Sequence, residues 1–182
     1  MCKEVSEGLA HLHAYDVIHA DLKGANVLIS SLGIPKLTDF GNTTLSQYTV
    51  QFTATTSALP ISLRWTAPEL VKGGKSFTKE ADVHALSMVF YEIVAGEVLF
   101  ARTIPEYAVY SLLMKGKTPE VPPAFGSMEE IQADMLQRVM AECWKSDLAE
   151  RSSANDIQLQ FEQLSQAETQ GSEDQVPDTH VG

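Results

Sequence analysis

The sequence predicts a mainly α domain that carries one small β-hairpin, with about six helices in all. Three observations lead to this fold class. The 182 residues are enough for one hydrophobic core and too few for two comfortable domains. The composition, 44% apolar and 20% charged, is typical of a globular chain. Apolar residues recur at helical spacing along most of the chain, and two short apolar runs meet around Gly33.

The opening residues form the first expected helix, which should end near Tyr15. Its apolar face, with spacing i, i+4 and i+7, consists of Val5, Leu9 and Leu12. Two short strands follow, with the sequences NVLIS (26–30) and IPKLT (34–38). We expect them to form a hairpin that turns around Gly33 and leads into the sequence DFG (39–41).

The middle of the chain is expected to contain a long loop followed by a buried helix. Residues 42–66 are rich in serine and threonine and predict a loop of about 25 residues, a length that usually indicates a functional loop. Residues 79–95 are apolar on nearly every side, which predicts a helix enclosed by the core. Thr78 is suited to cap its start and Gly96 to end it.

Three further helices are expected in the C-terminal part. The first covers about 105–115 and has a proline in its first turn. An amphipathic helix follows a proline-broken loop and covers about 131–143. The last helix is capped by Ser153, with Asp156 three residues on. Its apolar stripe consists of Ile157, Phe161 and Leu164.

The C-terminal residues differ in composition from the rest of the chain. Residues 166–182 are acidic, contain no lysine or arginine and have few apolar side chains to bury. Such a segment cannot offset the entropy that ordering it would cost. We therefore expect a folded domain over residues 1–165 and a disordered acidic tail over 166–182.

Charge and composition narrow the class of function. Thirteen basic residues against 24 acidic residues give a net charge of −11, which disfavours binding to nucleic-acid phosphates. No apolar run is long enough to predict a membrane span, and charged residues near the start leave no secretory signal. The two cysteines cannot form a disulfide framework. We expect an intracellular, cytoplasmic protein that binds neither nucleic acid nor membrane.

Four motifs occur in a fixed order along the chain. HADLKGAN (19–26) places an acid, a lysine and an asparagine within six residues, and TDFG (38–41) places Asp39 13 residues after Asn26. LRWTAPEL (63–70) closes the long loop, and CWKSDLAER (143–151) ends in an arginine seven residues after a tryptophan. Each motif is weak evidence when taken alone, but their order and spacing together form a strong signal.

With Asp82 on the buried helix, these motifs resemble the C-terminal lobe of a eukaryotic-type protein kinase over about residues 1–164. Lys23 and the sequence RWTAPEL resemble the corresponding residues of the Ser/Thr or tyrosine-kinase-like groups rather than those of tyrosine kinases. The resemblance implies an α+β kinase fold by family, of which this chain holds the C-terminal lobe. It also implies ATP-dependent phosphoryl transfer to serine or threonine of a protein substrate, with ATP and Mg²⁺ as cofactors.

The resemblance assigns roles to individual residues. Asp21 would orient the acceptor hydroxyl or accept its proton, and Lys23 would neutralise charge on the transferred phosphoryl group. Asn26 and Asp39 would hold Mg²⁺, because amide and carboxylate oxygens suit that ion. By resemblance Leu28 would lie under the adenine ring, although Leu28 taken alone is better interpreted as an ordinary core residue.

A second group would support the site. By resemblance, His19 and Phe40 stack in the core of the lobe, and Asp82 hydrogen-bonds the backbone of the His19 loop. Ser62 stands where the family usually places a threonine that contacts the catalytic Asp and Lys. The remaining members of this group are Gly41 of the DFG motif and the pair Glu69 and Arg151.

The sequence departs from the family pattern in two ways. It contains no glycine-rich loop, no strand lysine and no helix glutamate of the kind that covers the ATP phosphates in a complete kinase. Ala20 replaces the arginine that commonly receives an activating phosphate.

Three hypotheses about the chain follow. It is the catalytic half of a kinase, an inactive kinase-like module whose exposed cleft face is covered by a partner, or a remnant that does not fold stably.

Overall fold

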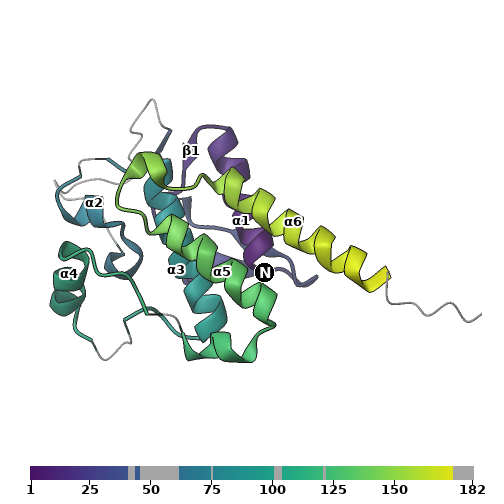
Figure 1. The fold of residues 1–182 in the computed structure, drawn as a ribbon. Coiled ribbons are helices and arrows are strands. Elements are labelled where there is room, and N and C mark those ends of the chain that lie inside the picture. The colour runs from purple at the N-terminus through teal and green to yellow at the C-terminus, as the bar shows by residue number, and fades with distance from the viewer. Residues whose placement is uncertain (41–43, 46–61, 75, 101–103, 121, 174–182) are drawn as a thin grey trace, which may run out of the picture.

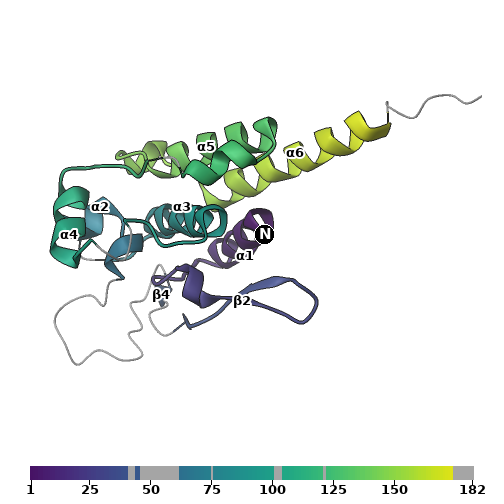
Figure 2. The same cartoon turned by 90° about the horizontal axis from the view of Figure 1, so that it is seen from below.

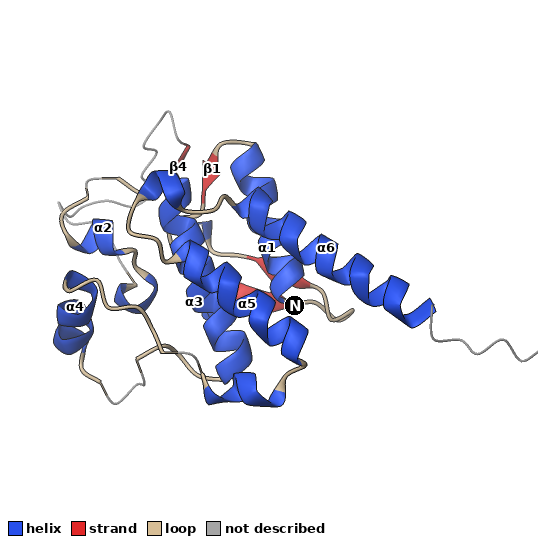
Figure 3. Ribbon diagram, in the orientation of Figure 1, coloured by secondary structure: helices blue, strands red, loops and turns tan. Residues whose placement is uncertain are grey.

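The computed structural model describes residues 1–40, 44–45, 62–74, 76–100, 104–120 and 122–173. Within this part of the chain there are six α-helices and two antiparallel pairs of strands, so the mainly α fold class is confirmed (Figures 1 and 3). The helices are α1 (Cys2–Ala14), α2 (Pro68–Val71), α3 (Lys79–Ala95), α4 (Glu106–Met114), α5 (Glu130–Cys143) and α6 (Ala154–Glu173). The strands are β1 (Val17–Ile18), β2 (Val27–Ile29), β3 (Pro35–Leu37) and β4 (Thr44–Leu45). The 3₁₀ turns are η1 (Gly24–Asn26), η3 (Leu63–Trp65), η4 (Pro123–Ser127) and η5 (Leu148–Glu150).

Helix α3 lies at the centre of the molecule beside α1, with α5 and α6 on one side of these two helices and the β2–β3 hairpin on the other (Figure 2). Its ends agree with the sequence prediction. The Thr78 hydroxyl accepts a hydrogen bond from the backbone of Ala81, and Gly96 ends the helix with a φ of 68°. Burial on every side explains why its sequence is apolar all round. The side chains of α3 join those of α1, α5 and α6 in one continuous core.

The predicted hairpin is also present. β2 pairs with β3 so that Leu28 faces Lys36, and the turn closes with a hydrogen bond of 2.9 Å from the Gly33 nitrogen to the Ser30 oxygen. Gly33 has a φ of 77°, a conformation that costs glycine no steric strain. The hairpin packs against α1 through Leu37, which lies beside Gly8. This packing sets where the chain goes after β3 and so positions Asp39.

Several elements differ from the sequence expectation. The short pair β1–β4 joins Val17 to Leu45 and Ile18 to Thr44, and helix α2 begins directly at Pro68. Pro105 precedes α4 as its N-cap residue instead of lying in the first turn. These elements are two to four residues long, or differ at one end only, so they leave little periodic signal in the sequence.

Helix α6 continues to Glu173, into the segment for which we expected a disordered tail. Figures 1 and 2 show its last turns projecting past the start of α1. The prediction rested on the acidic composition and the lack of apolar residues, whereas residues such as Gln166 and Ala167 have favourable helix propensity and can extend an existing helix. The last nine tail residues, 174–182, lie outside the described residues. A search of the described helices finds none with the length and apolar character needed to cross a bilayer.

Candidate active site

Asp82 of α3 holds in place residues 19–26, which the sequence predicts to be catalytic and which we name the catalytic loop. One carboxylate oxygen accepts hydrogen bonds from the backbone nitrogen of His19 at 2.7 Å and from Nε2 of His13 at 3.0 Å. The other oxygen accepts from the backbone nitrogen of Ala20 at 2.9 Å. The Asp82 side chain is only 3% exposed, so each of these donors offsets part of the cost of burying a charge.

Ala20 has a φ of 66°, in the left-handed region that costs a residue with a Cβ about 1 kcal/mol. The two backbone bonds to Asp82 hold this conformation. Asp21 follows directly, so the bend at Ala20 fixes the direction in which the Asp21 side chain leaves the loop. The sequence predicted the contact of Asp82 with this loop, but it did not predict the contact of His13 with Asp82. The sequence did indicate that His13 is buried, since His13 lies four residues after the buried Leu9 on the same face of α1.

Asp21, Lys23 and Ser62 form a closed cluster. The Ser62 hydroxyl donates to one oxygen of Asp21 at 2.7 Å, and Nζ of Lys23 donates to the other oxygen at 2.6 Å. Nζ of Lys23 also donates to Ser62 at 3.1 Å. The structure therefore brings a residue from the end of the long loop onto the acid and the lysine of the catalytic loop.

Asn26 also holds Asp21 in place, through hydrogen bonds from its side-chain amide. Its amide nitrogen donates to the backbone oxygen of Asp21 at 2.8 Å and to the side chain of Asp21 at 3.3 Å. Asn26 is buried at the end of the turn η1. Because the amide nitrogen is used within the loop, the amide oxygen is the atom that remains for a metal ion.

The hairpin register brings Asp39 beside this loop. The backbone nitrogen and the hydroxyl of Thr38 both donate to the backbone oxygen of Asn26, at 2.9 and 3.2 Å. Asp39 is the next residue, is exposed and has a φ of 62°, which aspartate tolerates better than most residues. Among the described residues nothing forms a hydrogen bond or an ion pair with its carboxylate. The oxygens of Asn26 and Asp39 thus fit the preference of Mg²⁺ for hard oxygen ligands.

His19 and Phe40 are in contact, with ring centroids 5.3 Å apart and planes tilted by 45°. His19 is fully buried, and its Nε2 lies 3.1 Å from the backbone oxygen of Thr38. Phe40, however, is 44% exposed, which corrects the expectation that both rings lie in the core. Phe40 follows the hairpin at the edge of the described fold, where it lines an open cavity together with residues of α1 and β3. Gly41 lies outside the described residues.

Leu28 also faces outward from this edge, with 57% of its side chain exposed. It belongs to β2, whose neighbour Ile29 is 50% exposed. The strand therefore presents apolar side chains next to the polar cluster. A flat apolar ring could rest on this surface, and the interpretation of Leu28 as an ordinary core residue does not agree with its exposure.

Glu69 and Arg151 form the predicted pair. The Arg151 guanidinium donates to the two carboxylate oxygens at 2.7 and 3.2 Å. The Arg151 side chain is fully buried, and that of Glu69 is 24% exposed. The pair lies away from the catalytic loop and joins α2 to the turn before α6. Its role is to hold elements together.

The family model described as "Protein kinase domain" matches residues 1–161. The serine/threonine-protein kinase STY17 of Arabidopsis thaliana is 29% identical over 179 residues, which cover 98% of this chain and 29% of the relative. The mitogen-activated protein kinase kinase kinase 5 of Homo sapiens is 32% identical over 158 residues, 85% of this chain and 11% of the relative.

A third relative, the dual specificity protein kinase pyk3 of Dictyostelium discoideum, is 27% identical over 164 residues. That alignment covers 90% of this chain and 11% of the relative. The chain thus spans less than a third of the length of these three relatives. With the family model matching 161 of 182 residues, this chain belongs to the protein kinase family.

Proposed function

We propose that this chain carries the phosphoryl-transfer site of a protein kinase that moves the γ-phosphate of ATP to serine or threonine hydroxyls of protein substrates. The observation that carries the proposal is the cluster in which Asp21 accepts from both Lys23 and Ser62 while Asn26 braces the same residue. The roles given to these residues are those of protein kinases in general. In this reaction class the protein contributes mainly positioning and electrostatic stabilisation.

In the proposed reaction the substrate hydroxyl oxygen bonds to the γ-phosphorus of ATP, the bond to the β–γ bridging oxygen breaks, and ADP leaves. Asp21 orients the hydroxyl and receives its proton. Lys23, whose Nζ already lies 2.6 Å from Asp21, places a positive charge where the transferred group is most negative. Ser62 limits the movement of both side chains, since its hydroxyl bonds to each of them.

Asn26 and Asp39 are the residues that would hold Mg²⁺ in this proposal. A bound Mg²⁺ offsets the charge of the ATP phosphates. The amide of Asn26 is fixed by its bonds to Asp21, and the backbone of Thr38 fixes the position of Asp39 relative to Asn26. Leu28, exposed on the adjacent strand, is the proposed contact for the adenine ring.

A second candidate function is a kinase-like module that binds a partner without transferring phosphate. It is favoured by the exposed apolar side chains of the hairpin and of Phe40, which follows the hairpin, because together they amount to a candidate interface. They are Leu28, Ile29, Leu32, Ile34 and Phe40, with exposed fractions of 57, 50, 82, 50 and 44%. In this alternative a protein partner covers the cleft face of the chain.

The experiment that separates the two functions is a transfer assay on residues 1–182. The protein is incubated with Mg²⁺, ATP labelled in the γ-phosphate and a generic protein substrate. If the chain carries the site, label should enter the substrate, and Asp21→Asn should reduce the rate by roughly 10²-fold to 10⁴-fold, the usual contribution of a general base. Asp39→Asn should reduce it as well.

Asp134→Asn is the matched control, since it removes one exposed carboxylate on α5 and should leave the rate unchanged. Label transfer that survives both Asp21→Asn and Asp39→Asn would exclude this site as its source. A folded chain that transfers no label under any condition would favour the partner-binding module.

A further inference from the structure

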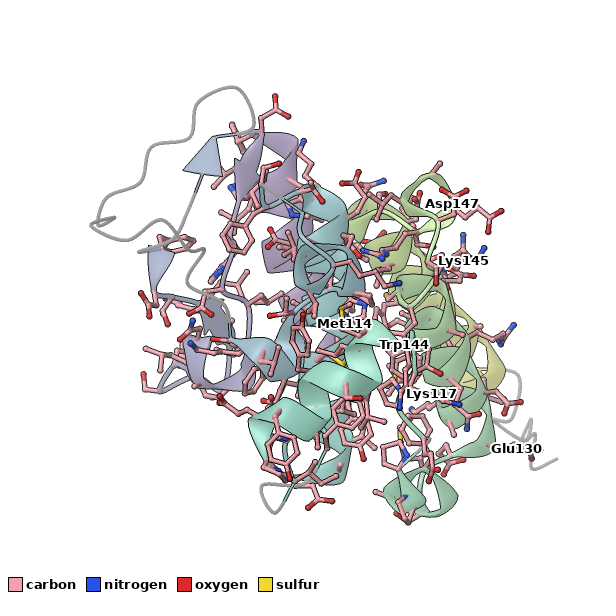
Figure 4. All side chains as sticks on the ribbon, turned by 90° about the vertical axis from the view of Figure 1, so that its left-hand side faces the viewer. Met114, Lys117, Glu130, Trp144, Lys145 and Asp147 are labelled. Atoms are coloured by element: carbon pink, nitrogen blue, oxygen red, sulfur yellow. The ribbon has the colours of Figure 1, made fainter. Side chains whose placement is uncertain are left out.

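Helix α4 has two apolar faces, and only one of them packs against the rest of the fold. Val109 and Leu113 are buried, with 0 and 1% of their surface exposed. Tyr107, Tyr110 and Met114 share a second face, at spacing i, i+3 and i+7, and are 79, 46 and 41% exposed. We call these three residues the α4 stripe. Figure 4 is viewed from the side on which α4 lies, and it labels Met114 at the end of the helix.

Two lysines follow the stripe at the C-terminal end of α4. Lys115 and Lys117 are exposed, and their position is held by a hydrogen bond of 3.1 Å from the Lys117 nitrogen to the Leu112 oxygen. Among the described residues neither lysine forms an ion pair, whereas three other lysines are paired with acids. The one charged residue of the helix, Glu106, lies at its opposite end. This surface is therefore apolar along the helix and positive at one end.

The buried face of α4 connects the helix to the candidate active site. Val109 and Leu113 belong to a small apolar cluster, and Leu63 packs against that cluster. Leu63 begins the turn η3 directly after Ser62, whose hydroxyl donates to Asp21. Because close packing transmits position from one side chain to the next, a segment bound on α4 is held at a defined place relative to Asp21.

We propose that the α4 stripe, together with Lys115 and Lys117, docks a segment of the protein substrate that carries apolar side chains at helical spacing and acidic residues at one end. Tyrosine offers a large contact area at low entropic cost, and methionine adapts to the shape of its partner. The two lysines favour an acidic partner and set its direction. The net charge of −11 opposes nucleic acid or an anionic membrane as the occupant.

Docking on α4 deepens the proposed function by naming a feature of the substrate. A docked substrate keeps its acceptor hydroxyl at a raised effective concentration near Asp21. This effect on phosphoryl transfer rests on the proposed function. The binding itself does not, and it can be measured without nucleotide.

The first test is a titration of ¹⁵N-labelled residues 1–182 with a designed helical peptide. The peptide carries leucines at i, i+3 and i+7 and glutamates at one end. The amide signals of α4 should shift and saturate, and those of the β2–β3 hairpin should stay in place. The double variant Tyr107→Ala/Tyr110→Ala should weaken the binding about tenfold, whereas Tyr15→Ala, which removes a tyrosine that is 69% exposed at the end of α1, should not.

The second test exchanges the charges. The double variant Lys115→Glu/Lys117→Glu should bind the acidic peptide about fivefold more weakly. A peptide with lysines in place of the glutamates should prefer this variant over the unchanged chain. Lys3→Glu/Lys36→Glu is the matched control, since it makes the same change in net charge on α1 and the hairpin, and it should bind the acidic peptide as the unchanged chain does.

The proposal is overturned if the α4 signals do not respond to the acidic peptide, or if the acidic and basic peptides bind the unchanged chain equally well. It is also overturned if the α4 signals shift with protein concentration in the absence of peptide, because the occupant is then a second copy of this chain.

An active chain allows a third measurement. A substrate fused to the acidic helical segment should have a KM about tenfold lower than the same substrate without it, with kcat unchanged. Tyr107→Ala/Tyr110→Ala should remove that difference, and a difference that persists in this variant would contradict docking on α4. A chain that binds the peptide on α4 but transfers no phosphate would reject only the proposed function.

Discussion

His84 is a buried residue whose environment is unfavourable for charge. Its side chain is 3% exposed, and within the described structure neither ring nitrogen has a hydrogen-bond partner. Burial lowers the pKa of His84 to about 3, the nearby positive charge of Arg151 adds to that effect, and the backbone of Cys143 opposes it. The folded chain therefore holds this ring neutral at pH values where an unfolded chain would protonate it.

The free energy of unfolding should consequently depend on pH through His84. The unfolded chain takes up the proton below about pH 6.5 and the folded chain only near pH 3, so this contribution is complete above pH 6.5 and is lost as the pH falls. The loss should be about 1.4 kcal/mol per pH unit between those values. Urea unfolding at pH 7.5, 6 and 5 measures it.

His84→Phe removes the titrating ring. Between pH 7.5 and pH 5 its free energy of unfolding should therefore fall by roughly 2 kcal/mol less than that of the unchanged chain. Identical pH dependence in His84→Phe and the unchanged chain would contradict a neutral buried ring.

At the level of single residues, the sequence predicted most of the cluster because the motifs are local. Asp21, Lys23 and Asn26 lie within six residues, and Ser62 stood at a fixed distance before the APE motif. The contribution of His13 depends on which residues its helix faces after folding. A histidine on a helix has the same local pattern whether it is solvated or bonded to a distant segment.

Arg151 joins three elements through one guanidinium group. Besides its two bonds to Glu69 of α2, it donates to the backbone oxygen of Glu80 in α3 at 2.8 Å. Two further bonds, of 3.2 and 2.9 Å, reach the backbone oxygen of Lys145 after α5. The planar arginine fork suits such convergent acceptors, and lysine offers only three donors from a single atom.

Replacing Arg151 should therefore destabilise the fold strongly. Arg151→Ala leaves the Glu69 carboxylate and two backbone oxygens without their donor, and we expect a loss of about 3 kcal/mol in the free energy of unfolding. Arg151→Lys should recover only part of it. Denaturant unfolding measures both variants.

Arg138 is the matched control, because it lies exposed on α5 and makes one long bond of 3.3 Å to the backbone of Asp134. Arg138→Ala should change the free energy of unfolding by less than about 0.5 kcal/mol. If Arg151→Ala is as mild as Arg138→Ala, the convergence of elements at this residue does not stabilise the fold.

At the level of elements, long periodic segments were predictable and short ones were not. α3 has both ends where the sequence placed them, because its cap, its glycine stop and its apolar run agree. The β1–β4 pair depends on a partner 26 or 28 residues away in the chain, and two-residue strands carry no period of their own. α6 differs in the opposite way, because it continues to Glu173 in a segment that was expected to be disordered.

Across the whole molecule, the core and the candidate active site occupy different places. The continuous core is built mainly from α1, α3, α5 and α6 and includes Leu22 of the catalytic loop, whereas the cluster around Asp21 lies beside the hairpin, where apolar side chains are exposed. The site is thus supported by a completed core on one side and open on the other. An open site of this kind should bind nucleotide weakly, through the metal ligands and the hairpin surface.

The measurement that tests this account most directly is a titration of ¹⁵N-labelled residues 1–182 with Mg-ATP. The account predicts that the signals of the Asn26 side-chain amide and the Asp39 backbone amide shift and saturate at millimolar Mg-ATP. The shifts should be absent with ATP and a chelator, lost in Asp39→Asn and kept in Asp134→Asn. Signals that remain unchanged throughout the titration, or that shift equally in Asp39→Asn, would contradict it.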